Sequence, residues 1–182
     1  MQRAIDSGAT TIYLPAGATF FFGKPVEIRG NVQRIVGMFA DVRGVKGDAV
    51  WRLMDGKSPV VVIQEIHGDL KVEHHTTRTL VVKDGQGLGG HLLEGGEVFI
   101  ENITANWNFS KGNAWARQYN NEHEGTHVSN AGANLWILGL KTERGGTLIE
   151  TKAGASTEVI GGLCYTTTKG KLAPMFVSND AR

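Results

Sequence analysis

The chain has 182 residues, the size of one domain with a sizeable core rather than of a two-domain enzyme. Its 19 basic and 18 acidic side chains give a formal net charge of +1, so no overall field directs it to nucleic acid or to an anionic membrane. Glycine, at 25 residues, is about twice as common as usual, which is typical of many tight turns. The single cysteine, Cys164, excludes an internal disulfide. No apolar run approaches the ~18 residues that span a bilayer.

A short helix over residues 2–7 is the first predicted element, and Gly8 ends it. After it, short β-rich runs alternate with Gly, Asn and Asp, a pattern that indicates strands joined by turns. In chain order these runs are 10–14, 26–28, 32–36, 60–63, 79–82, 98–100, 135–138 and 157–160. A last strand is expected at 175–180, so the chain is predicted to be all-β after its first turn of helix.

The spacing of these runs predicts a solenoid. An apolar residue from the middle of each unit recurs about every 20 residues, and these residues are Ile35, Ile63, Val81, Ile100, Ala116, Ile137 and Val159. Residues 136–139 also align with 158–161 without a gap. Units of this kind bury their apolar face only by stacking on their neighbours.

Two other architectures agree less well with the pattern. A leucine-rich repeat needs regularly spaced leucines and an asparagine, which are absent. A β-sandwich favours tight Asn-Gly or Asp-Gly hairpins, and the sequence has only Asp55-Gly56 and Asp84-Gly85. We therefore expect one domain over 1–182: a right-handed single-stranded parallel β-helix of about seven turns with an N-terminal capping helix.

Residues 4–17, Ala-Ile-Asp-Ser-Gly-Ala-Thr-Thr-Ile-Tyr-Leu-Pro-Ala-Gly, resemble the opening of pectate lyase-like β-helix proteins related to family 55 glucanases and phage tailspikes. Segments 115–118, 125–127 and 135–143 resemble bacterial members of this superfamily. The acidic Asp-Asp-Thr stretch that usually precedes the capping helix is missing, and no cap follows the last strand. The resemblance implies part of a longer chain, located outside the cell or on its surface, that binds polysaccharide along a groove.

The richest candidate site lies between residues 107 and 124. Trp107 and Trp115 offer aromatic surface to a pyranose ring, and Arg117, Gln118 and Asn120 offer planar hydrogen-bonding groups. For both tryptophans a place in the core is the alternative interpretation, and for an aromatic residue it is the more common one. The sequence therefore predicts contacts to polysaccharide from this stretch.

Glycoside hydrolysis needs a proton donor with a raised pKa and a second carboxylate nearby. Glu122 and Glu143 lie about one turn apart in the sequence, so they could occupy adjacent turns on the same face. Glu101, Glu124 and Glu158 are further candidates. We therefore expect Glu122 and Glu143 to be the catalytic pair if the protein cleaves its ligand.

No metal or cofactor site is predicted. His123-Glu124-Gly125-Thr126-His127 matches the letters of a zinc-peptidase motif, but its glycine and its turn-rich surroundings do not suit the required helix. The aspartates are scattered, which disfavours a calcium-dependent lyase. The glycine-rich loop at 85–90 is not followed by a helix, which disfavours phosphate binding.

Two functions are left open by these patterns. The first is recognition, with or without cleavage, of a polysaccharide, and the second is a non-catalytic structural or assembly module. Neither needs nucleic acid or a membrane as partner. Because no amphipathic cover follows residues 174–177, we also expect self-association through the C-terminal turns.

Overall fold

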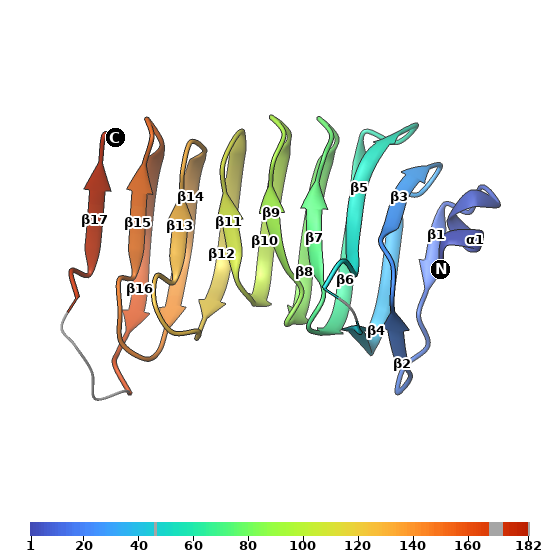
Figure 1. Cartoon of the computed structure of the whole chain (residues 1–182), viewed down its shortest axis with the longest axis horizontal. Helices are drawn as coiled ribbons and strands as arrows, with labels where there is room; N and C mark the ends of the chain where they lie inside the picture. The colour runs from blue at the N-terminus through green and yellow to red at the C-terminus, as the bar shows by residue number, and fades with distance from the viewer. Residues whose placement is uncertain (46, 168–172, 182) are drawn as a thin grey trace.

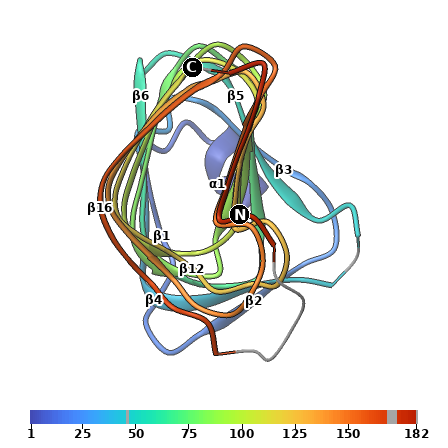
Figure 2. The ribbon, with the colours of Figure 1, turned by 90° about the vertical axis from the view of Figure 1, so that its left-hand side faces the viewer.

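The computed structural model describes residues 1–45, 47–167 and 173–181. In these ranges the chain forms a parallel β-solenoid of about 7 turns with one short N-terminal helix (Figure 1). The predicted fold is confirmed. Seen along its axis, the turns superimpose closely around a common core (Figure 2).

Each turn gives one strand to each of two parallel sheets, except that the first turn gives two strands, β1 and β2, to the first sheet. Sheet A contains β1 Thr11–Tyr13, β2 Thr19–Phe22, β4 Arg34–Gly44, β6 Val60–Gly68, β8 Thr79–Gln86, β10 Glu97–Thr104, β12 Asn113–Asn121, β14 Asn134–Thr142 and β16 Ser156–Cys164. Sheet B contains β3 Val26–Gly30, β5 Val50–Gly56, β7 Lys71–His74, β9 Gly89–Leu92, β11 Trp107–Phe109, β13 Val128–Asn130, β15 Ile149–Lys152 and β17 Phe176–Asn179. Strands follow chain order along both sheets, which is the topology of a solenoid.

The strand register confirms the sequence period with one correction. Ala116 pairs with Ile100 and with Ile137, and all three are buried. Val81, however, is wrong as a core residue, because Val82 is the buried partner of Ile63 and Val81 lies on the outer face. Two valines stand side by side here, and a shift of one residue reverses the face of a strand.

Most strands of sheet B were not predicted from the sequence, which indicated only β3 and β17 among them. Most of these strands have three or four residues, and β9 contains two glycines and a histidine. Such segments lack the β-branched runs that mark a strand. Their inward side chains, such as Trp51, Leu92 and Trp107, complete the core against sheet A.

The long strands of sheet A are bent at one residue in each turn. Glu65, Asp84, Asn102 and Gln118 occupy this position with φ between 50° and 57°, and Gly139 has φ 84° in the next turn. A side chain in this left-handed region is uncommon and marks a local change of chain direction. The bend divides the outer face of sheet A into a first arm before it and a second arm after it.

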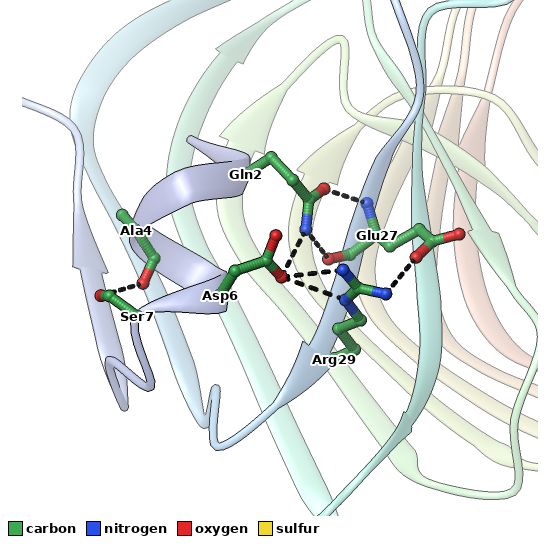
Figure 3. A network of polar contacts seen from close by, with 6 residues as sticks. All are labelled: Gln2, Ala4, Asp6, Ser7, Glu27 and Arg29. Carbon is green, nitrogen blue, oxygen red and sulfur yellow. Dashed lines mark hydrogen bonds and ion pairs between the residues drawn. The ribbon is translucent and has the colours of Figure 1, made fainter.

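The predicted N-terminal helix is confirmed as α1, Gln2–Asp6. Ile5, only 2% exposed, covers the end of the core. Gln2 binds the backbone of Glu27 through both amide atoms, and Arg29 donates to Asp6 (Figure 3). In the described ranges no helix is long and apolar enough to span a membrane.

At the other end, β16 and β17 are the outermost strands of their sheets. Val159 continues the core column of Ile137 but is 37% exposed, whereas Ile137 is 1% exposed. Phe176 continues the column of buried Ile149 and is 65% exposed. The described residues therefore leave the core columns uncovered at this end.

Candidate functional site

Four of the five predicted contact residues lie on one outer face. In β12, Trp115 and Arg117 precede the bend, Gln118 forms it, and Asn120 follows it. The residues between them, including Ala116 and Tyr119, are buried. The bend shifts the alternation by one residue, which brings 115, 117, 118 and 120 to the same face.

Trp107 is wrong as a surface contact residue. It lies in β11 of sheet B and is completely buried in the core. Its indole Nε1 donates to the carbonyl of Leu88 at 3.2 Å, and its amide donates to the hydroxyl of Tyr119 at 3.1 Å. In this strand the outward residue is Asn108, so the aromatic surface of Trp107 cannot meet a ligand.

The first arm carries an aromatic ladder, formed by Phe99, Trp115 and Trp136 in three successive turns. The ring centroids of Phe99 and Trp115 are 4.8 Å apart, and those of Trp115 and Trp136 are 5.2 Å apart. In each pair the two ring planes make an angle of only 10°. Each ring therefore covers the face of its neighbour and presents mainly its edge to solvent. The expected stacking of a sugar on the face of Trp115 is not available in this arrangement.

A shallow apolar trough of about 290 Å³ runs beside the ladder. Its other wall is formed by Leu138, Ile160 and Arg117, whose guanidinium forms an ion pair with Glu101. All these side chains come from β10, β12, β14 and β16. The trough offers apolar contact area and few hydrogen-bonding groups.

The second arm carries a column of hydrogen-bonding side chains, one in each turn. Strand pairing aligns Asp41, His67, Gln86, Thr104, Asn120 and Lys141. Neighbouring strands lie about 4.8 Å apart, so this polar column extends over about 24 Å. Asn120 Nδ2 donates to Thr104 Oγ1 at 3.3 Å, which links two successive members.

A groove follows the first four members of this column. It consists of two overlapping hollows of about 470 and 390 Å³, which share Phe39, His67, Gln86 and Thr104 in their lining. The side toward the bend is lined by Glu65, Asp84 and Asn102. We call this feature the polar groove.

Phe39 closes the polar groove at β4. The pairing of β4 with β6 shifts between Val36 and Ala40, and the extra residues Met38 and Phe39 both have positive φ. This bulge raises the Phe39 ring, 55% exposed, beside the His67 imidazole, with centroids 5.3 Å apart. The groove thus combines one exposed aromatic ring with several planar polar groups.

Glu122 and Glu143 form a charge cluster at the far end of the polar column. Asn121 pairs with Thr142, so the two glutamates that follow these residues lie in adjacent turns, as their spacing predicted. Lys141 Nζ donates to both carboxylates. Glu143 also accepts from the Tyr165 hydroxyl at 2.6 Å, and Glu122 accepts from the Asn120 amide at 2.8 Å.

This cluster keeps both glutamates ionised. Hydrogen bonds from Lys141 and Asn120 lower the pKa of Glu122, and hydrogen bonds from Lys141 and Tyr165 lower the pKa of Glu143. A glycosidase proton donor requires the opposite shift. The geometry brings the predicted pair together but gives it the electrostatics of an ion-pair network.

The His123–His127 motif lies between β12 and β13 and is not on a helix. Asn121 Oδ1 contacts the His123 ring, and His127 is fully buried beside it, with ring centroids 5.6 Å apart. Across the described part of the chain, no three His, Cys, Asp or Glu side chains are arranged to hold a metal ion. The motif therefore lacks the helical geometry of a zinc peptidase.

The polar groove was not predicted from the sequence. Its polar column members Asp41, His67, Gln86 and Thr104 stand in different units, one in each, so no local cluster marks them. Their shared register on the outer face of successive turns is the signal that could have found them.

No protein family, curated protein or solved structure matches the chain. The solenoid architecture agrees with the β-helix part of the resemblance drawn from residues 4–17. Membership of the pectate lyase-like superfamily has no support from a relative. We therefore infer function from the geometry of the outer face.

Proposed function

We propose that this protein recognises an extended polysaccharide that lies along the polar groove and the polar column of sheet A. The observation that carries the proposal is the in-register column from Asp41 to Lys141, with the groove and the exposed Phe39 ring at its start. A polymer of repeating units can make a similar contact in each turn. The spacing of about 4.8 Å between turns is comparable to the length of one pyranose unit.

The chemistry of the lining supports a carbohydrate ligand. Gln86, Asn102 and Thr104 donate and accept hydrogen bonds without charge, which suits sugar hydroxyls. Phe39 supplies an apolar surface for the C–H groups of one sugar ring. A nucleic acid would need a basic surface instead.

Binding is supported better than cleavage. Glu122 and Glu143 share Lys141 and have lowered pKa values, so neither matches a general acid. We therefore place these two residues at the end of the binding surface rather than in a hydrolytic pair. The pectate lyase-like family, with its secreted polysaccharide-binding members, is the assignment that we propose on this basis.

The test is a panel of soluble polysaccharides, with affinity measured by calorimetry or by retardation in polysaccharide-containing gels. The double variant His67→Ala/Gln86→Ala removes two successive members of the polar column. It should lose at least tenfold in affinity, because each hydrogen bond to a sugar hydroxyl contributes about 1 kcal/mol. Asn108→Ala on the outer face of sheet B is the matched control and should bind normally.

Two results would overturn the proposal: no binding to any polysaccharide in the panel, or equal binding by the wild type and the double variant.

The alternative function is a structural or assembly module. The stacked ladder of Phe99, Trp115 and Trp136 favours it, because three rings that cover one another stabilise the solenoid without any ligand.

A further inference from the structure

We propose that the polar groove selects uncharged polysaccharides and rejects polyuronates, with Glu65 and Asp84 as the residues that set this specificity. The inference rests on the proposed function and names the ligand class of the same site. Neither carboxylate was among the site residues predicted from the sequence.

Glu65 and Asp84 occupy equivalent positions in adjacent turns. Gln64 pairs with Lys83 and His67 pairs with Gln86, which places the two acidic residues side by side at the bend of β6 and β8. Both line the hollow of about 390 Å³, together with Phe39 and Asn102. A chain that follows the polar column must therefore pass both carboxylates.

The balance of charge in the groove is negative. Its lining contains three acidic side chains, Asp41, Glu65 and Asp84, and one arginine, Arg43. Arg43 Nη2 lies 2.7 Å from the carboxylate of Asp41, so this cation is already paired. Lys83 Nζ forms a longer ion pair with Asp84, at 3.9 Å, and does not line either hollow, so it offsets only part of the Asp84 charge from outside the groove.

The two carboxylates retain free capacity to accept hydrogen bonds. A carboxylate offers about four lone-pair positions. Glu65 accepts from the Gln64 amide at 3.0 Å, and Asp84 accepts from the Asn102 amide at 3.0 Å. The remaining positions suit the hydroxyl donors of a neutral sugar, whereas the carboxylate of a uronic acid would meet two like charges without a free cation.

The experiment uses one polysaccharide backbone in two forms. The polymer that binds best in the panel is compared with the same polymer after oxidation of its primary hydroxyls to carboxylates. At low salt the wild type should bind the neutral form on the order of tenfold more tightly, because two like charges at close range oppose the oxidised form. Raising the salt concentration should narrow the difference.

The double variant Glu65→Gln/Asp84→Asn should bring the two affinities to within about twofold of each other, because it removes the like charges that oppose the oxidised polymer. The readout is the ratio of the two affinities, since the loss of the carboxylate acceptors weakens the contacts to both forms. Asparagine and glutamine keep the side-chain size, and asparagine tolerates positive φ well. Glu97→Gln, an exposed carboxylate on the first arm of β10, is the matched control and should keep the wild-type preference.

Equal or tighter binding of the oxidised polymer by the wild type would refute the specificity while leaving polysaccharide recognition intact. So would a preference for the neutral polymer that the double variant leaves unchanged. If the wild type binds no polysaccharide at all, the proposed function fails first and the inference fails with it.

Discussion

Arg78 is the residue whose replacement should damage the solenoid most clearly. Arg78 is only 6% exposed. Its guanidinium donates hydrogen bonds to three backbone carbonyl groups in earlier turns. Nε donates to Ser58 at 2.6 Å, Nη1 to Met54 at 3.1 Å and Nη2 to Val32 at 2.8 Å. One side chain thus connects three successive turns of the core.

The cost of Arg78→Met follows from these contacts. A hydrogen bond to a charged group contributes about 1.5–3 kcal/mol, and the three carbonyls would lose their charged donor together. Burial of the charged guanidinium is unfavourable and lowers the pKa of Arg78. Replacement by methionine removes this cost of burial, which offsets part of the loss. We expect a net loss of about 3–5 kcal/mol in the free energy of unfolding, or about 10 °C in Tm.

Urea unfolding followed by circular dichroism measures this change, and hydrogen exchange shows whether it is concentrated in the first turns. The control is Arg34→Met, the same substitution at an exposed position on β4, which should change stability by less than about 0.5 kcal/mol. If Arg78→Met unfolds within about 1 kcal/mol of the wild type, the guanidinium does not hold the turns together.

Four further predictions concern the core, the ladder, the pH dependence and the C-terminal end. Ile137→Asp puts an unpaired carboxylate into a site that is 1% exposed and should cost several kcal/mol; a soluble, cooperatively folding variant would contradict the inward assignment. Trp115→Ala removes two stacking contacts of about 0.5–1.5 kcal/mol each and should lower stability in thermal unfolding, whereas Trp115→Phe should keep most of it. Burial lowers the pKa of His74 and His127, so the unfolded chain binds more protons; the urea midpoint should be constant above about pH 6.5 and fall as the pH drops below it, and a flat profile to pH 5 would refute this. Phe176, 65% exposed on an outermost strand, should support self-association in light scattering, and Phe176→Lys should reduce it; a strictly monomeric wild type at high concentration would rule this out.

The sequence by itself determined the architecture. Stacked turns place equivalent residues in register, so a repeated apolar residue such as Ile100, Ala116 or Ile137 reports the period directly. The same spacing predicts that Glu122 and Glu143 lie in adjacent turns, as the strand pairing shows. The helix at the N-terminus was also readable, because a glycine ends it and β-branched residues follow.

Only the tertiary structure decided which residues face solvent and what surrounds them. Trp107 and Trp115 are the same residue type eight positions apart, yet one fills the core behind sheet B and the other stacks in the outer ladder. The bend at Gln118 changes the alternation within β12, and a left-handed residue other than glycine has no reliable signal in a single sequence.

The polar groove and the hydrogen bonds of the Arg78 guanidinium depend on contacts between turns. Each turn contributes one residue to the polar column, such as His67 or Gln86, and these meet only when the strands are stacked in register. In the sequence, Arg78 cannot be distinguished from a surface arginine, because the carbonyl groups of Val32 and Met54 that it binds lie in other turns. A local sequence pattern shows which face of a strand is apolar and is therefore buried. The partners of a polar side chain come instead from turns about 20 residues or more away in the sequence, so they depend on how the turns pack.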